Sequence, residues 1–445
     1  MGVIMQAFHW DCPRNDNQEY TWWNFVRERI DSLAQVGFTS LWLPPVHKAA
    51  NIGGPSMGYD PYDYYDLGEF NQKGSVKTWF GSKQELLDLI AKAHTCGMMV
   101  VADMVLNHNS GADAEELNLI DGRARWTFFN PKSGRFPRDW TCFNPSQFEI
   151  MDLGTFGDMP DLCHRNPIVY GEILKLARWL VEEIGFDGFR YDFAKGYGSW
   201  VVEAIQEYRY ERDGKSIKPY GVGENWGSGD DIKNWLNETN EWSDNPVGAF
   251  DFPLREVLKC LCDDFNFSLK TLDEAESILT EAPVRAVTFV ENHDMREDGK
   301  PIINDKLLAY GYILTHEGYP CVFWKDYYNY DLGKEGTPFG IAALVAAHEA
   351  YAAGPTATLL AEDGLYIMQR CGYHEKPGLI FVLNNRGDGW GGAPVTTQWR
   401  NTGFKPVAWW SSQDLACPAE KWTDAQGQAD FWAPPRGYVV YAPNA

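Results

Sequence analysis

Three acidic residues stand at the ends of short apolar runs, and their side chains could do acid–base and nucleophilic chemistry. The runs and their acids are 188–191 with Asp192, 220–223 with Glu224, and 286–290 with Asp294. Side chains alternate between the faces of a strand, so Arg190 and Asp192 point the same way and the guanidinium can keep the carboxylate ionised. An ionised carboxylate is a nucleophile and a protonated carboxylic acid is a proton donor. The alternative for Arg190 and Asp192 is a structural ion pair.

The other carboxylates need different surroundings. A proton donor at Glu224 would have to stay protonated, and we expect negatively charged neighbours and the aromatic ring of Trp226 to favour that form. The polar residues His108 and His293 also lie just beyond apolar runs. A barrel with only a structural role has no reason to gather such a cluster at the ends of its strands.

Eight short apolar runs alternate with helical patterns through the first three quarters of the chain, which is typical of a parallel sheet covered by helices. Eight is the number of strands that closes a (β/α)8 barrel, whose catalytic groups lie at the C-terminal ends of the strands. The predicted strands are 3–8, 40–43, 98–104, 188–192, 220–224, 249–252, 286–290 and 320–323.

Helix signals separate these runs. Residues 22–36 have helical spacing of apolar positions and end before Gly37, and Ser82 with Glu85 forms a capping box for a helix that ends at Gly97. Asn166 and Pro167 are an N-cap and a first-turn proline for a helix that ends at Gly185.

About sixty residues separate the third strand from its helix, far more than a normal connection. We therefore predict a barrel of residues 1–105 and 167–353 with an inserted domain at 106–166. Short alternating runs after the eighth helix (about 339–353) predict a C-terminal antiparallel β-sheet domain at 354–445. We expect that domain to be structural, with Trp409 and Trp410 in its core rather than serving as sugar platforms.

Composition narrows the class of ligand. The 445 residues carry a formal charge of −23 and include 19 tryptophans. The negative charge disfavours nucleic acid, whereas aromatic side chains can stack on neutral sugars. Apolar runs long enough for a membrane span do not occur. Nine cysteines without a CxxC pair suggest mostly reduced thiols and argue against a zinc framework, although Cys142 and Cys163 could pair in a secreted protein.

The first residues lead directly into a strand, and they are too short and uncharged for a signal peptide. A cytoplasmic location is therefore expected for the sequence as printed, and a secreted one if a leader has been removed. We expect a monomer that binds neither nucleic acid nor membranes.

Five segments, in order, resemble the motifs of the α-amylase family of glycoside hydrolases, and the resemblance extends over essentially the full length. The segments are Ala102–His108, Met159–Leu162, Gly188–Gly196, Gly223–Trp226 and Val290–Asp294. Residues 312–316 also resemble plant α-amylases and a bacterial maltotetraose-forming amylase. The resemblance implies a starch-hydrolysing TIM barrel. Glu291 stands where the family commonly has Asp, and Met159–Cys163 lacks the form typical of α-1,6-glucosidases, which favours α-1,4 activity.

The resemblance implies a role for each matched residue. Asp192 matches the nucleophile, Glu224 the general acid/base, and Asp294 the third carboxylate, which grips sugar hydroxyls. The implied substrate contacts are Arg190, His108, His293, Tyr59, Lys195 and Trp226, while Asp103 is expected to support Arg190. Glycoside cleavage needs one carboxylate and one carboxylic acid, in agreement with this set.

A calcium ion is also expected. The inserted domain has little apolar surface for docking, and Ca²⁺ accepts carboxylate, amide and carbonyl oxygens in flexible geometry. The resemblance gives Asn107, Asp161 and the Gly196 carbonyl as ligands, with Asp152 or Asp158 as an additional one. The alternative is that Asn107 and Asp161 only cap loops.

Three functions remain open. The first is endo-acting hydrolysis of α-1,4-glucosidic bonds in starch, glycogen and maltooligosaccharides, with the retention of configuration that the resemblance implies. The second is an exo-acting maltooligosaccharide-forming amylase or a transglycosylase, because all of these share the three acids. The third is a non-catalytic glucan-binding protein, which would be expected to have lost some of the acids.

Overall fold

A computed structural model describes residues 2–13, 21–50, 56–149, 154–240 and 244–444. Eight parallel strands form a closed barrel in the order β1-β14-β13-β12-β11-β8-β5-β2. Their bounds are β1 Ile4–Gln6, β2 Ser40–Trp42, β5 Met99–Met104, β8 Gly188–Tyr191, β11 Tyr220–Gly223, β12 Gly248–Phe250, β13 Ala286–Phe289 and β14 Tyr319–Phe323. The strand count and positions predicted from the sequence are confirmed.

The helices that follow these strands begin and end largely where local signals predict. Ser82 and Glu85 cap α3 reciprocally, and Asn166 with Pro167 begins α4. Gly185 ends a π-helical turn, Leu180–Ile184, in a left-handed conformation with φ of 102°. The helices are α1 Trp22–Arg27, α2 Ile30–Val36, α3 Lys83–Thr95, α4 Pro167–Trp179, α5 Ser199–Gln206, α6 Gly229–Thr239, α7 Phe252–Asp263, α8 Thr271–Glu274, α9 Ile278–Glu281, α10 Lys306–Ile313 and α11 Ile341–Tyr351.

One predicted helix is divided in two. The sequence predicts a continuous helix over residues 22–36, but α1 ends at Arg27 and α2 begins at Ile30. The backbone N–H of Arg29 donates to the carbonyl of Val26, three residues back, instead of the fourth residue back. This tighter turn interrupts the α-helical hydrogen bonding without a glycine or proline.

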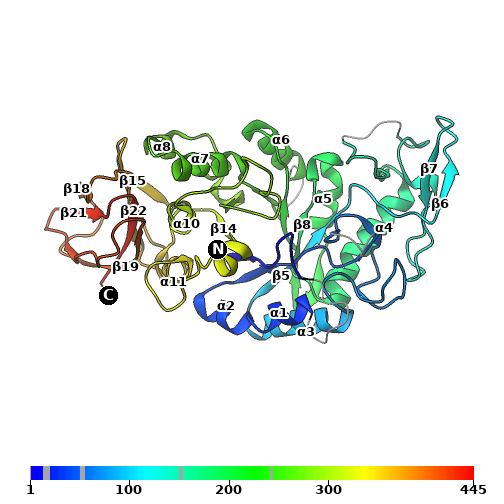
Figure 1. Ribbon diagram of the computed structural model, residues 1–445, viewed down its shortest axis with the longest axis horizontal. Coiled ribbons are helices and arrows are strands. Elements are labelled where there is room, and N and C mark those ends of the chain that lie inside the picture. The colour runs from blue at the N-terminus through cyan, green and yellow to red at the C-terminus, as the bar shows by residue number, and fades with distance from the viewer. Residues whose placement is uncertain (1, 14–20, 51–55, 150–153, 241–243, 445) are drawn as a thin grey trace. The chain divides into compact units, whose positions relative to one another are not determined.

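Contacts between residues divide the chain into two compact units. The first unit comprises Met1–Gln6, Gln35–Thr39 and Asp251–Ala445, and the second comprises Ala7–Ala34 and Ser40–Phe250. The second unit contains the predicted insertion, where β6 (Ala114–Leu117) and β7 (Ala124–Phe128) form a hairpin at its edge (Figure 1). The boundaries of three domains stay a prediction, since this division groups the chain differently.

Two short hairpins complete the second unit. The first joins β3 (Lys48–Ala49) to β4 (Pro61–Asp63), and the second joins β9 (Tyr210–Arg212) to β10 (Lys215–Ile217). Neither hairpin was predicted from the sequence.

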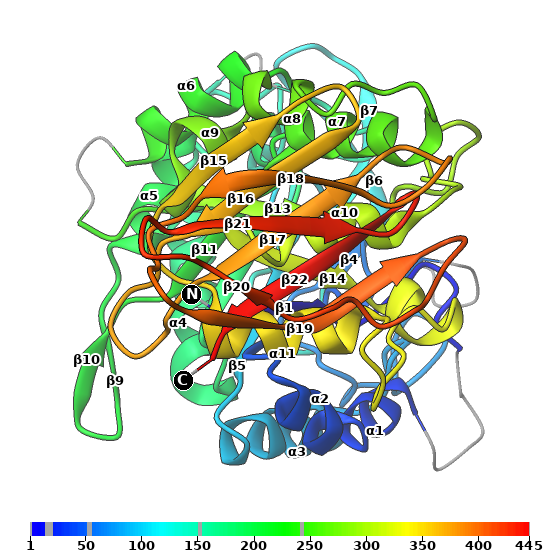
Figure 2. The same cartoon turned by 90° about the vertical axis from the view of Figure 1, so that its left-hand side faces the viewer.

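The predicted C-terminal β-structure is present in the first unit. Six antiparallel strands form one sheet in the order β15-β16-β17-β22-β19-β20, and the β18–β21 ribbon lies over it (Figure 2). Apolar side chains of both layers, such as Ile380 and Phe431, form one buried core between them. The strands are β15 Thr356–Ala361, β16 Leu365–Arg370, β17 Leu379–Asn384, β18 Gly391–Thr396, β19 Gly403–Ser411, β20 Lys421–Trp422, β21 Gln428–Ala433 and β22 Gly437–Pro443.

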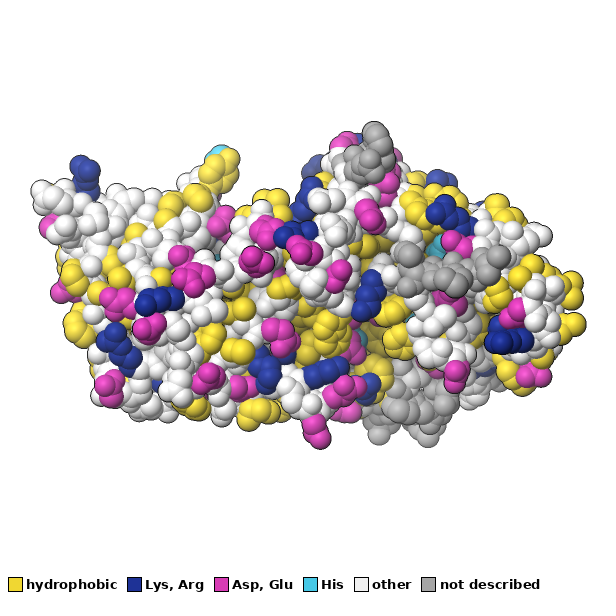
Figure 3. Space-filling model, turned by 90° about the horizontal axis from the view of Figure 1, so that it is seen from above, with side chains coloured by type: hydrophobic (Ala, Val, Ile, Leu, Met, Phe, Trp, Pro, Cys, Tyr) yellow, Lys and Arg dark blue, Asp and Glu magenta, His cyan; other side chains and the backbone are white. Residues whose placement is uncertain are grey.

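The surface agrees with the charge seen in the sequence. On the face shown in Figure 3, acidic and basic side chains are intermixed and the basic ones do not gather into a stripe. Within the described residues, no helix is long and apolar enough to cross a membrane. All nine cysteines, including Cys142 and Cys163, are free thiols in the structure.

Candidate active site

Arg190 is the centre of the polar cluster in the second unit. Its side chain is buried on β8, and its Nη1 lies 2.6 Å from Asp192 Oδ1 and 2.9 Å from Asp103 Oδ1. The alternation of side chains along the strand therefore brings Arg190 and Asp192 together as predicted. The expected support of Arg190 by Asp103 is also present, because Asp103 on β5 is the direct register partner of Arg190.

Glu224 contacts the same guanidinium. Its Oε2 lies 2.9 Å from Arg190 Nη2 and accepts a hydrogen bond of 2.9 Å from the backbone N–H of Phe193. Pairing of β8 with β11 explains the contact, since the Glu224 N–H donates to the carbonyl of Tyr191. A cation and an N–H donor both favour the carboxylate form. The surroundings therefore differ from the sequence-based expectation of negative and aromatic neighbours alone.

Aromatic side chains bind Asp103, one of the acidic partners of Arg190. Asp103 Oδ2 accepts hydrogen bonds from the Tyr59 hydroxyl at 2.9 Å and from Trp42 Nε1 at 3.0 Å. Burial raises the pKa of Asp103 to about 6, although Arg190 acts in the opposite direction. The half-buried Tyr59 ring stacks on Trp10 with their centroids 5.9 Å apart. Trp10, which the sequence reasoning missed, thus extends the aromatic surface predicted at Tyr59.

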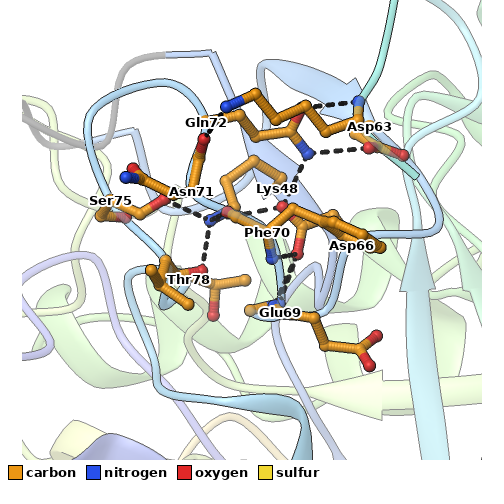
Figure 4. A network of polar contacts seen from close by, with 12 residues as sticks. Lys48, Asp63, Asp66, Glu69, Phe70, Asn71, Gln72, Ser75 and Thr78 are labelled. Carbon is orange, nitrogen blue, oxygen red and sulfur yellow. Dashed lines mark hydrogen bonds and ion pairs between the residues drawn. The ribbon is translucent and has the colours of Figure 1, made fainter. Parts of the chain in front are cut away.

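A buried lysine anchors the segment that follows the β3–β4 hairpin, the hairpin whose loop carries Tyr59. Lys48 Nζ lies 3.4 Å from Asp66 Oδ2 and donates to the carbonyls of Phe70, Ser75, Val76 and Lys77 at 2.5–3.3 Å (Figure 4). Both charged side chains are fully buried. Asp66 also accepts three backbone N–H bonds, so the buried pair is fully hydrogen-bonded and fixes the segment that follows the hairpin.

His108 lies beside Tyr59 in the same unit. Its Nε2 is 2.9 Å from the carbonyl oxygen of Tyr59, and its ring stacks on Phe156 with centroids 4.8 Å apart. Burial lowers the pKa of His108, which favours the neutral ring. Its Nδ1 is buried and has no hydrogen-bond partner within the described part of the chain. A neutral histidine held in this way can exchange a hydrogen bond with a hydroxyl group.

Lys195 and Trp226 line a second feature, a cavity of about 310 Å³ beside the segment that follows Glu224 in the chain. Lys195 Nζ donates to the Trp226 carbonyl at 2.7 Å, which links the segments after β8 and β11. The cavity is lined by Lys195, Tyr197, Ser199, Asn225, Trp226, Gly227, Asp231, Asn234, Trp235 and Glu238. Of these ten residues only Lys195 and Trp226 were predicted from the sequence as site residues, and the participation of α6 was not predicted.

The other predicted site residues, Asp294 and His293, belong to the first unit and follow β13. His293 is buried, with Nδ1 2.9 Å from Gln6 Nε2 and Nε2 3.4 Å from Asp294 Oδ2. The Asp294 backbone N–H donates to the Asn292 side chain at 2.9 Å. Gln6, on β1, was not predicted, and it fixes the ring that contacts Asp294.

Glu291 anchors the start of this segment. It is buried, it accepts the Ile302 N–H at 2.5 Å, and it lies 3.4 Å from Arg255 and 3.5 Å from Lys306. Burial raises the pKa of Glu291 to about 7, which Lys306 and Arg255 oppose and Asp326 reinforces. The longer acid in place of aspartate thus joins β13 to α7, to α10 and to the loop before α10.

Three of the predicted metal ligands lie together. Asn107 is fully buried, and neither atom of its amide has a hydrogen-bond partner among the residues described here. A Cβ on Gly196 would lie 2.2 Å from Asn107 Oδ1, so the glycine backbone is directly beside this amide. Asp161 pairs with His108 in an isolated bridge, and Leu162 N–H donates to the Asn107 carbonyl.

The remaining candidates differ from these three. Asp158 is exposed, and Asp152 lies outside the described residues. The described residues contain no group of three or more His, Cys, Asp or Glu side chains suited to a metal ion. Asn107, Asp161 and Gly196 offer one carboxylate, one amide and one carbonyl, which is an oxygen set suited to a hard cation.

The chain is similar to several known proteins. A family model described as the alpha amylase catalytic domain matches residues 13–323. The chain is 32% identical to an alpha-amylase of Geobacillus stearothermophilus, over 85% of this chain and 76% of the relative. It is 30% identical to the cytoplasmic alpha-amylase of Escherichia coli, over 87% of this chain and 89% of the relative. It is 29% identical to a glucan 1,4-alpha-maltohexaosidase of a Bacillus species, over 88% of this chain and 83% of the relative.

Solved structures have the same fold. An alpha-amylase from Geobacillus thermoleovorans, in complex with acarbose, superposes with a TM-score of 0.70 at 19% identity, covering 100% of this chain and 98% of the other. A cyclomaltodextrin glucanotransferase superposes with a TM-score of 0.72 at 19% identity, covering 100% of this chain and 99% of the other.

Proposed function

Because the chain belongs to the alpha-amylase family of glycoside hydrolases, we propose that it hydrolyses internal α-1,4-glucosidic bonds in starch, glycogen and maltooligosaccharides. The observation that carries the proposal is the contact of one buried guanidinium, that of Arg190, with both Asp192 and Glu224. These two acids end neighbouring strands, β8 and β11, at the position where a barrel of this type places catalytic groups.

In the proposed reaction Asp192 attacks the anomeric carbon while Glu224 gives its proton to the leaving glycosidic oxygen. The bond between the anomeric carbon and that oxygen breaks, and a bond from that carbon to Asp192 forms. Glu224 then removes a proton from a water molecule, the water oxygen bonds to the anomeric carbon, and the bond from that carbon to Asp192 breaks, with net retention of configuration. Asp294 and the histidines would hold sugar hydroxyls, Tyr59 with Trp10 would stack on a ring, and Lys195 would contact the leaving side.

The contacts of Glu224 set a condition on this reaction. Arg190 and the Phe193 N–H stabilise the ionised form, whereas the first step needs the protonated one. A bound sugar would exclude water from Glu224, and desolvation favours the neutral acid. We therefore propose that substrate binding raises the proton affinity of Glu224.

We also propose a structural calcium ion held by the Asn107 side chain, Asp161 and the Gly196 carbonyl. The buried Asn107 amide beside Gly196 supports this set. Bound calcium would supply a cross-link between the inserted segment and the turn that follows Asp192. Positioning of Asp192 itself rests on Arg190.

Glu224→Gln tests the assignment of the proton donor. The substitution keeps the shape of the side chain and removes the acid, so turnover should fall by roughly 10³-fold or more while glucan binding remains. Glu203→Gln, an isosteric change at a half-buried position on α5, is the matched control and should keep full turnover. Retention of more than a tenth of the wild-type rate by Glu224→Gln would exclude Glu224 as the donor.

An end-blocked maltooligosaccharide tests the mode of attack. Internal cleavage should release oligosaccharides from the blocked substrate and a broad range of early products from soluble starch. The second candidate is an exo-acting or transglycosylating enzyme, which the similarity to a maltohexaosidase and to a cyclomaltodextrin glucanotransferase keeps open. A single dominant product length with an intact blocked substrate would favour the exo-acting enzyme, and products longer than the substrate would favour the transferase.

A further inference from the structure

A cavity of about 780 Å³ lies in the first unit between α10, the loop before α11 and strand β19. None of the proposed catalytic residues lines it. Its volume falls within the range of about 300–1,000 Å³ that small-molecule sites usually have. Its lining includes three aromatic residues, Tyr330, Phe339 and Trp410, and the aliphatic residues Leu307 and Leu332.

The three aromatic rings are held in place by the surrounding structure. Tyr330 is 54% exposed, yet the Lys306 ammonium lies 5.0 Å from its ring centroid. Phe339 packs edge-on against Trp409 with centroids 5.6 Å apart, and the backbone N–H of Trp409 donates to the Pro338 carbonyl. The backbone of Trp410 is held in β19 by its register pairing with Tyr438 of β22. A ligand would therefore meet ordered, accessible ring faces, which lowers the entropy cost of binding.

The charged side chains of the cavity are already neutralised within the protein. Lys306 lies 2.7 Å from Asp326, Asp305 lies 2.8 Å from Arg436, and Lys334 pairs with Asp331. An anionic or cationic ligand would gain little here, because each charge has an opposite partner. The cavity favours a neutral ligand that has apolar ring faces and some hydrogen-bonding groups.

We propose that this cavity is a second α-glucan site, in which sugar rings stack on Tyr330, Phe339 and Trp410. The choice of α-glucan over other neutral ligands rests on the proposed function. Sugar rings present C–H faces to aromatic side chains, and Thr337, Lys334 and Asp305 at the cavity offer partners for hydroxyl groups. Trp410 is half-buried and lines this cavity, which differs from the sequence-based expectation of an enclosed position in the domain core.

β-Cyclodextrin, a cyclic α-1,4-glucan without chain ends, is a suitable probe for calorimetric titration of the full-length Glu224→Gln protein. We expect two classes of sites for β-cyclodextrin. The affinity of one class should fall by about tenfold or more in Tyr330→Ala and in Trp410→Ala. Tyr373→Ala removes a 65% exposed tyrosine elsewhere in the same unit and should leave both classes unchanged. In the otherwise wild-type enzyme, Tyr330→Ala should hydrolyse a short blocked maltooligosaccharide within twofold of the normal rate.

Two results would overturn the site. The first is β-cyclodextrin binding that neither Tyr330→Ala nor Trp410→Ala changes in proteins that melt like the parent. The second is binding of the straight-chain fatty acid decanoate in the cavity without any binding of β-cyclodextrin there. Failure of the proposed function is separate, because it would appear as absence of α-glucan hydrolysis by the wild-type enzyme.

Discussion

Replacing Arg190 with lysine should lower both the stability of the protein and its turnover rate. The guanidinium uses Nη1 for Asp103 and Asp192 and Nη2 for Glu224, at distances of 2.6–2.9 Å. Lysine has one nitrogen on a shorter stem and cannot occupy both positions of the planar fork. At least one buried carboxylate then loses a charge-assisted hydrogen bond, which costs about 1.5–3 kcal/mol of the free energy of unfolding.

The effect on turnover should be larger than the loss of stability suggests. Arg190 holds the proposed nucleophile and the proposed proton donor at once, and a misplacement of about 1 Å can cost roughly 10²-fold in rate. We expect Arg190→Lys to lose about that factor in kcat on an end-blocked maltooligosaccharide at a temperature where it is fully folded.

Thermal melting and steady-state kinetics would measure the two effects. Arg178→Lys makes the same chemical change at an exposed position on α4 and should alter neither quantity. If Arg190→Lys melts within the error of the Arg178→Lys control and keeps more than half of the wild-type kcat, the guanidinium does not position the two acids.

Two further predictions concern pH and metal. Burial raises the pKa of Glu291 from 4.5 to about 7, so Glu291 binds a proton more tightly in the folded protein than in the unfolded chain. Protonated Glu291 therefore contributes to the free energy of unfolding in full below pH 4.5. About 3 kcal/mol of that contribution is lost as the pH rises to 7. Between pH 5 and pH 8, the free energy of unfolding measured by denaturation should fall less for Glu291→Gln than for wild type or for the exposed control Glu274→Gln. An equal fall in all three proteins would contradict the argument from burial of Glu291. Chelation should lower the melting temperature and activity together, with calcium restoring both better than magnesium, and Asp161→Ala should abolish the response. A melting temperature of metal-free protein that calcium does not change would rule out the proposed ion.

The fold was largely predictable because its signals are local. Apolar runs, the Ser82 capping box, the Asn166 N-cap and Gly185 each act within a few residues, and the structure has elements at all of these places. The break between α1 and α2 was missed, because a shift to i→i−3 bonding at Arg29 follows packing and has no glycine or proline to signal it.

The candidate site was predictable only in part. The pairing of Arg190 with Asp192 follows from alternation over two residues. By contrast, Gln6 and His293 are 287 residues apart, and no pattern in either segment indicates their contact. The buried pair of Lys48 and Asp66 was missed for a similar reason, since a lysine is normally exposed and no local pattern indicates a buried acidic partner 18 residues away.

Register between neighbouring strands explains why Arg190 has three acidic partners. β8 lies between β5 and β11 in the barrel, with Asp103 directly opposite Arg190 on one side and Val222 opposite on the other. Glu224 is two residues beyond Val222 and so lies on the same face. A slip of one residue in either pairing would turn the corresponding acid away from the guanidinium. The site therefore depends on two registers at once, and a single strand's sequence specifies neither of them.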